Sequence, residues 1–100
     1  MTKVTIKLAP VELLGLGSYS TNFKTEVVKE LASKYEVGKS YETTLAGLEA
    51  AREAFDLTNN PARQTEREAR YGRYRSVSVG DIVVVDGKEY FCDNFGWLEL

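Results

Sequence analysis

The chain has 100 residues, which is enough for one domain with a single modest core, so we expect residues 1–100 to form one domain. Hydrophobic residues make up 43% of the chain and charged residues 28%, a composition typical of folded globular proteins and not of disordered ones. The formal net charge of −2 argues against a dedicated nucleic-acid module, because such modules are usually basic.

The lack of histidine excludes most catalytic designs, among them Ser-His-Asp and Cys-His nucleophiles and histidine-ligated metals. Cys92 is the single cysteine, so we expect neither an internal disulfide nor a structural zinc site. No apolar run reaches the roughly 18–20 residues that span a bilayer, and the N-terminus lacks a signal-peptide core. We therefore expect a cytoplasmic protein that is not an enzyme and that binds no cofactor, metal or membrane.

The first half of the chain predicts one strand and two amphipathic helices. Residues 2–8 alternate polar and apolar side chains, which is the pattern of a half-buried strand. Apolar residues at helical spacing predict a first helix from about Phe23 to Glu36, with Gly38 as its stop signal. A second helix is predicted to open at Thr43 or Thr44 and to run through Leu57.

A third helix is predicted over about Pro61 to Tyr71, with Asn60 as its cap and Gly72 as its end. It has almost no apolar stripe. We therefore expect it to lie on the surface, or to be ordered partly by a partner.

The strongest strand signal lies near the C-terminus, where Asp86-Gly87 separates two apolar runs. Such a dipeptide predicts a two-residue hairpin turn with positive φ at both positions. In that register Val83 faces Tyr90, and Ile82 faces Phe91. A strand that is apolar on both faces is usually central in its sheet. Residues 97–100 can add a last short strand.

These elements together predict an α+β fold. A small, mostly antiparallel sheet, built from the N-terminal strand and the C-terminal hairpin, would pack against two amphipathic helices. The third, basic helix would lie on the surface.

The arginine segment (residues 61–75) is the most suggestive feature for function. It carries five arginines against two glutamates, for a net charge of +3, and residues 76–100 that follow carry −4. Arginines interleaved with tyrosines can grip phosphates and stack bases, or they can contact an acidic protein surface. Alternatively, Glu66 and Glu68 neutralise part of the segment, and the remaining arginines pair with the acidic tail.

Trp97 joins the candidate surface because an aromatic cluster beside arginines is typical of binding hot spots. The candidate partner-binding residues are Arg63, Arg67, Arg70, Tyr71, Arg73, Tyr74, Arg75 and Trp97. On this hypothesis, replacing Arg67 and Arg70 by glutamate removes partner binding without unfolding the protein.

The acidic residues near the C-terminus do not predict a metal site. Asp86 is explained by the hairpin turn, and Asp81 by local backbone bonding at the entrance of a strand. Asp81, Asp86 and Asp93 would not converge on one ion in this hairpin. Cys92 lies on the same hairpin face as Val83 and is expected to be a buried, inert thiol.

Residues 55–97 contain motifs that resemble YodL-like small proteins of phages, plasmids and conjugative elements. The matching residues are Leu57-Thr58-Asn59, Pro61, Arg63, Tyr71, Arg75-Ser76-Val77-Ser78-Val79-Gly80-Asp81-Ile82-Val83-Val84-Val85-Asp86-Gly87, Tyr90, Cys92 and Gly96-Trp97. The resemblance implies a mobile-element origin and an accessory role, acting against host machinery or host defence. It implies no catalytic residues.

The leading hypothesis is therefore a non-enzymatic phage or mobile-element protein of the host cytoplasm. It would bind a host protein or complex through an acidic surface and inhibit it, as host-takeover and anti-defence proteins do. The alternative is an accessory nucleic-acid-binding module that uses the arginine segment. A monomer and a homodimer are both compatible with the sequence.

Overall fold

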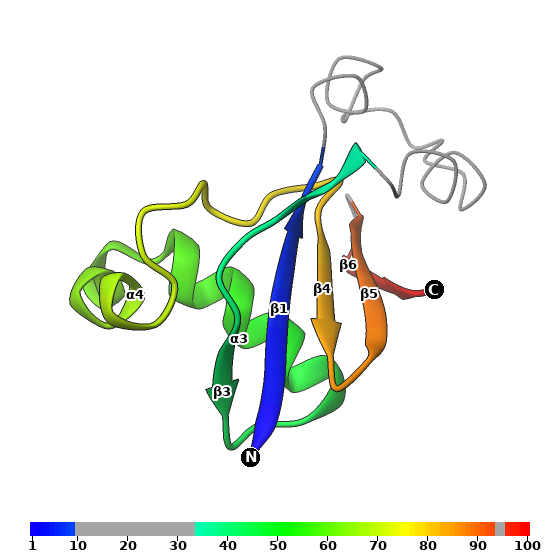
Figure 1. Cartoon of the computed structure of the whole chain (residues 1–100), viewed down its shortest axis with the longest axis horizontal. Coiled ribbons are helices and arrows are strands. Elements are labelled where there is room, and N and C mark those ends of the chain that lie inside the picture. Colours follow the sequence, from blue (N-terminus) through cyan, green and yellow to red (C-terminus); the bar gives the residue numbers. More distant parts are fainter. Residues whose placement is uncertain (10–33, 94–95) are drawn as a thin grey trace.

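An antiparallel six-stranded sheet forms the frame of the protein (Figure 1). The computed structural model describes residues 1–9, 34–93 and 96–100. The strand order is β2-β1-β4-β5-β6, and β3 pairs with the same edge of β1 as β2 does. The strands are β1 (Thr2–Leu8), β2 (Glu36–Val37), β3 (Tyr41–Thr43), β4 (Ile82–Val85), β5 (Lys88–Asp93) and β6 (Gly96–Glu99). The predicted α+β class and antiparallel sheet are confirmed.

The described residues contain two α-helices, α3 (Gly47–Asn59) and α4 (Gln64–Arg70), which are joined through the 3-10 turn η2 (Pro61–Arg63). Helix α3 covers one face of the sheet, and α4 packs against α3 away from the strands (Figure 1). The predicted basic surface helix corresponds to η2 and α4, and none of its residues up to Arg70 is fully buried. No helix in the described ranges is long and apolar enough to cross a membrane.

Two predicted helix boundaries differ from the structure. Helix α3 begins at Gly47 and not at Thr43 or Thr44, because Thr43 belongs to β3 and pairs with Thr2. The helix predicted over residues 23–36 lies mostly outside the described residues. Its predicted end is wrong, because Glu36 pairs with Leu8 as part of β2. Strand pairing thus overrides the local helical pattern at both places.

The C-terminal hairpin has the predicted turn and register. Asp86 and Gly87 have φ values of 48° and 85°, as a two-residue turn with positive φ requires. Val83 pairs with Tyr90, and Ile82 with Phe91. Strand β4 lies between β1 and β5, so the central position that its apolar faces predict is confirmed.

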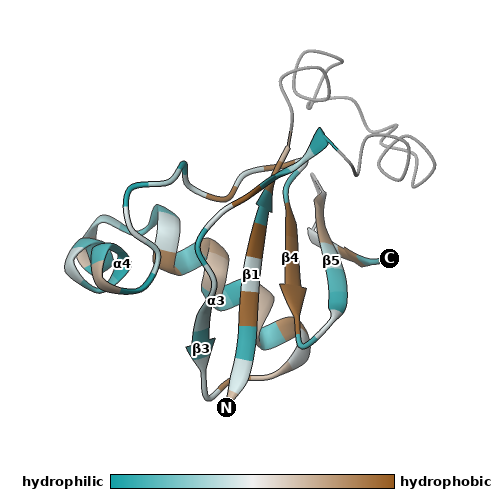
Figure 2. Cartoon of the chain, viewed as in Figure 1, coloured by the Kyte–Doolittle hydropathy of each residue, from teal (hydrophilic) through white to brown (hydrophobic). Residues whose placement is uncertain are grey.

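The main core lies between the sheet and α3. Strands β1, β4 and β5 contribute alternate side chains to it, and α3 contributes three alanines and Leu57. Small alanines let the helix backbone approach the sheet closely. Figure 2 shows the contrast between the hydrophobic β4 and the largely hydrophilic α4. A second, smaller cluster on the opposite face contains Tyr35, Ile82 and Phe91.

A bulge at Gly38 separates β2 from β3. Lys7 pairs with Val37 and Val4 with Tyr41, so the strand opposite β1 contains one extra residue between these pairs. The Gly38 N–H donates to the Ile6 carbonyl oxygen at 2.8 Å. A Cβ at Gly38 would lie 3.2 Å from Tyr71 Cε1, so the missing side chain makes room for the tyrosine ring.

Candidate partner-binding surface

Arg63 and Arg70 face the acidic side chains of α3 and α4. Arg63 forms ion pairs with Asp56 at 2.9 Å and with Glu66 at 2.7 Å. Arg70 lies 3.7 Å from Glu53 and 3.6 Å from Glu66. Hydrogen bonds from Arg63 lower the pKa of both the Asp56 and the Glu66 carboxyl groups. These two arginines are therefore neutralised within the molecule and join α4 to α3.

Arg67 binds backbone carbonyl groups instead of carboxylates. Its Nε donates to the Thr58 carbonyl near the end of α3 at 3.2 Å, and its Nη1 donates to the Gly72 carbonyl at 2.8 Å. Its Nη2 donates to the carbonyl of Tyr74. A cation at these positions satisfies carbonyls left unpaired at a helix C-terminus. Arg67 thereby fixes the start of the loop that follows α4.

Arg75 forms a bidentate pair with Asp81, at 2.8 and 2.9 Å. Asp81 is fully buried, and its carboxylate also accepts hydrogen bonds from the backbone N–H groups of Ala9 at 2.7 Å and Ser78 at 2.8 Å. The hydrogen bond to Asp81 raises the pKa of Arg75. The predicted backbone bonding of Asp81 at the strand entrance is confirmed, and Arg75 completes it.

Tyr71 is a core residue, which corrects its predicted place on a binding surface. Its side chain has no exposed area, and its hydroxyl donates to the Arg75 carbonyl at 2.7 Å. Burial raises its pKa to about 12, so the hydroxyl stays a donor at neutral pH. Trp97 is partly buried and packs against the main core.

Arg73 and Tyr74 remain exposed at the tip of the 71–76 loop. Within the described ranges, the Arg73 side chain makes no hydrogen bond or ion pair. The Tyr74 side chain is 41% exposed, and its ring centroid lies 5.7 Å from that of Tyr71. The two residues line an open hollow of about 260 Å³. A cation and an aromatic ring are thus presented together on a backbone that Arg67 and Tyr71 hold in place.

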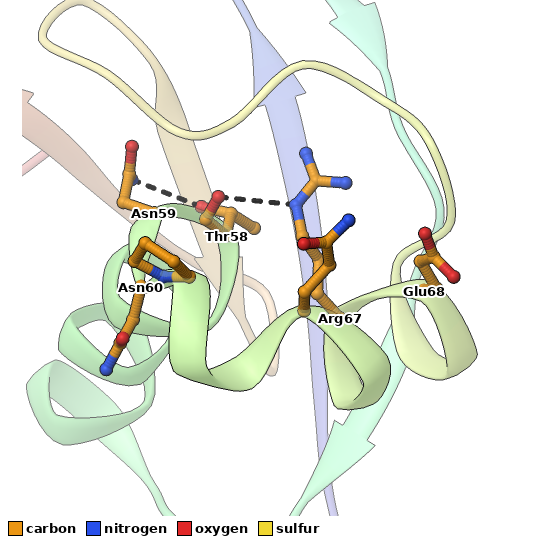
Figure 3. Close-up of a pocket in the computed structure, with 7 residues that line it drawn as sticks. Thr58, Asn59, Asn60, Arg67 and Glu68 are labelled. Atoms are coloured by element: carbon orange, nitrogen blue, oxygen red, sulfur yellow. Dashed lines mark hydrogen bonds between the residues drawn. The ribbon is translucent and has the colours of Figure 1, made fainter.

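A second hollow, of about 180 Å³, lies between the end of α3 and α4 (Figure 3). It is lined by Thr58, Asn59, Asn60, Pro61, Gln64, Arg67 and Glu68. Several of these side chains already have partners. Asn59 Nδ2 donates to the Phe55 and Val77 carbonyls at 2.9 and 2.8 Å, and the Thr58 hydroxyl accepts from the Val77 N–H at 3.0 Å. The hollow therefore lies where Val77, which follows the 71–76 loop, is hydrogen-bonded to the end of α3.

The role of Thr58 and Asn59 was not visible in the sequence. Their spacing from Val77 is 19 and 18 residues, and no local pattern indicates such a contact. Among the described residues, no group of three His, Cys, Asp or Glu side chains could hold a metal ion. No family model, curated protein or solved structure matches the chain.

Proposed function

We propose that this chain is a non-enzymatic accessory protein of a phage or other mobile element, which binds a host protein complex in the host cytoplasm and interferes with it. The observation that carries the proposal is the 71–76 loop. It holds Arg73 and Tyr74 outward, although the neighbouring arginines are bound within the molecule. The resemblance of residues 55–97 to YodL-like proteins supports the mobile-element origin.

The fixed backbone of this loop supports a role in binding. The Arg67 guanidinium donates to the Gly72 and Tyr74 carbonyls, and the Tyr71 hydroxyl donates to the Arg75 carbonyl. These bonds restrict the loop before any partner arrives, which lowers the entropy lost on binding. Arginine and tyrosine are also the side chains most enriched at binding hot spots.

An acidic protein surface fits this loop better than a nucleic acid does. Binding to duplex DNA depends on several phosphate contacts, each made by a free cation. Four of the five arginines in the segment form ion pairs or hydrogen bonds with groups of the same molecule. The Arg73 guanidinium, which has no partner among the described residues, and the adjacent Tyr74 ring are enough to bind a carboxylate in a protein interface.

The test is affinity capture from a lysate of a candidate host, with and without nuclease, followed by mass spectrometry. The proposal predicts a stoichiometric protein that survives nuclease and is lost from the variant Arg73→Glu with Tyr74→Ala. The matched control is Arg52→Glu, because Arg52 is also exposed and makes no polar contact in the described part of the chain. Loss of all partners with nuclease would contradict the proposal and favour a nucleic-acid-binding module. Equal capture by both variants would overturn the assignment of the loop.

A further inference from the structure

The two edges of the sheet differ in how well they are protected. One edge is formed by β2 and β3, which are only two and three residues long and are separated by the bulge at Gly38. Glu36 and Glu42 add exposed charges there. Short strands, bulges and charges are the devices that prevent a sheet edge from pairing with another chain.

The opposite edge, β6, has fewer of these devices: it is four residues long, and its one charged residue is Glu99. Strand β6 pairs with β5 over four consecutive residue pairs without a bulge, and it contains no proline or lysine. Among the described strands, none pairs with its outer side. Leu98 is 41% exposed on this strand. A strand edge that is unpaired among the described residues, beside an exposed leucine, is a site where another strand can add.

The hydrogen-bond pattern shows which backbone groups of β6 point outward. The Leu100 N–H donates to the Glu89 carbonyl at 2.9 Å, so Leu100 bonds toward β5. Because bonding direction alternates along an antiparallel strand, Leu98 also bonds toward β5, whereas Trp97 and Glu99 bond away from it. Cys92, which is opposite Trp97, accordingly bonds on its far side, to Asp81 and Gly80. Two N–H groups and two carbonyls therefore lie on the outer edge.

We infer that β6 pairs with β6 of a second copy of this chain, antiparallel about a two-fold axis at Leu98. In this register Trp97 of each copy faces Glu99 of the other, and both residues have outward-pointing backbone groups. All four outer groups of each strand are then used, in four hydrogen bonds between the copies. The two Leu98 side chains meet across the axis and cover each other.

Charge favours a two-fold axis at Leu98 over one shifted by one residue, to Glu99. Moving the axis to Glu99 would place two carboxylates directly opposite each other, which destabilises a pair of strands. With the axis at Leu98, each Glu99 lies opposite a tryptophan. It also keeps its ion pair with Lys88, which is 3.2 Å long.

This dimer is independent of the proposed host contact. Helix α4 and the loop after it lie beyond the β3 side of the sheet, whereas β6 forms the other edge (Figure 1). Pairing through β6 would leave both 71–76 loops accessible, so each dimer could engage two partner surfaces.

Cysteine cross-linking tests the register directly. Residues opposite each other in a non-hydrogen-bonded pair lie close enough for a disulfide, so Leu98→Cys should form a covalent dimer under mild oxidation. The control is Val37→Cys, because Val37 is 56% exposed but lies on the protected edge. The parent chain, in which Cys92 is buried, controls for the native thiol.

Analytical ultracentrifugation over a range of protein concentrations provides the second readout. Glu99→Pro removes the outward N–H, whereas Glu99→Ala removes only the side chain and its ion pair. We expect Glu99→Pro to raise the dimer dissociation constant by about tenfold or more relative to Glu99→Ala, since it removes two of the four hydrogen bonds. A parent chain that stays monomeric throughout would overturn the inference. So would a Leu98→Cys variant that cross-links no faster than Val37→Cys.

Discussion

The arginine segment divides into two parts that share a composition and differ in what surrounds them. Arg63 ends η2, and Arg67 and Arg70 belong to α4. All three have carboxylates or carbonyls of α3 and of the loop within reach. Arg73, at the loop tip, has no such acceptor in the described part of the chain. The comparison teaches that positive charge in a sequence does not define a binding surface. Only the arginines left without an acceptor are available to a partner.

A second contrast lies within the bound arginines themselves. The Arg75–Asp81 pair includes a fully buried carboxylate, whereas the two shortest Arg63 pairs, with Asp56 and Glu66, involve carboxylates that are 54% and 40% exposed. Removing one partner of a buried pair leaves polar groups unsatisfied, but exposed pairs contribute little because water replaces them. The following substitutions test this difference, from the largest expected effect to the smallest.

Asp81→Ala should cause the largest loss of stability. It leaves Arg75 without its carboxylate and the N–H groups of Ala9 and Ser78 without an acceptor. We expect the free energy of unfolding to fall by about 3 kcal/mol, measured by urea denaturation. The matched control is Asp56→Ala, which removes an exposed carboxylate from Arg63 and should have a much smaller effect. Similar losses in both variants would show that burial does not separate the two pairs.

Gly38→Ala should destabilise the protein by about 1–3 kcal/mol, the usual cost of overpacking a core. The added Cβ would lie 3.2 Å from Tyr71 Cε1 and 3.3 Å from the Ile6 carbonyl oxygen, and neither group can move freely. Thermal unfolding provides the measurement, with the exposed neighbour Lys39→Ala as control. An unchanged melting temperature in Gly38→Ala would mean that Tyr71 is not packed against the bulge.

Arg63→Gln should cause a smaller loss, and that loss should depend on pH and salt. The folded-state pKa values of Asp56 and Glu66 are lowered by Arg63, so the pairs stabilise the fold above the ordinary carboxyl range of about 4. The contribution disappears as pH falls through the lowered folded values. The difference in stability between the parent and Arg63→Gln should therefore vanish at acidic pH and shrink in high salt. A difference that persists in acid would contradict the ion-pair explanation.

Tyr41→Phe should have the smallest effect. The Tyr41 hydroxyl is buried and has no hydrogen-bond partner within the described residues. Removing it relieves the cost of an unsatisfied polar group, so stability should stay the same or rise slightly. Chemical denaturation of Tyr41→Phe beside Tyr71→Phe makes the comparison, because the Tyr71 hydroxyl has a partner in the Arg75 carbonyl. A clear loss of stability in Tyr41→Phe would show that its hydroxyl is satisfied in solution.

The sequence predicted the elements whose signals are local. The hairpin turn at Asp86-Gly87 and the register of β4 against β5 follow from turn chemistry and apolar alternation. The basic surface helix follows from its lack of an apolar stripe. For the candidate binding site, the sequence identified the arginine segment. It also left open the alternative that these arginines are bound within the molecule.

The remaining features depend on contacts between distant residues. Tyr71 gave no periodic core signal, because it follows a polar helix and is buried only when the loop folds back beside Gly38. The bulge at Gly38 resembled a helix stop, since both use glycine. The anchoring of Val77 by Thr58 spans 19 residues and leaves no mark in either local sequence. The structure at Tyr71, Gly38 and Val77 is therefore determined by contacts between residues distant in the sequence, and not by local propensity.

The most direct test of the division within the arginine segment compares two double variants with the same change in net charge. Arg67→Glu with Arg70→Glu alters two bound arginines, and Arg52→Glu with Arg73→Glu alters two exposed arginines without polar contacts in the described structure. We predict that the melting temperature of the first variant lies roughly 10 °C below that of the parent, and that the second variant has the same melting temperature as the parent. Equal melting temperatures for the two variants would contradict the division and would return Arg67 and Arg70 to the candidate binding surface.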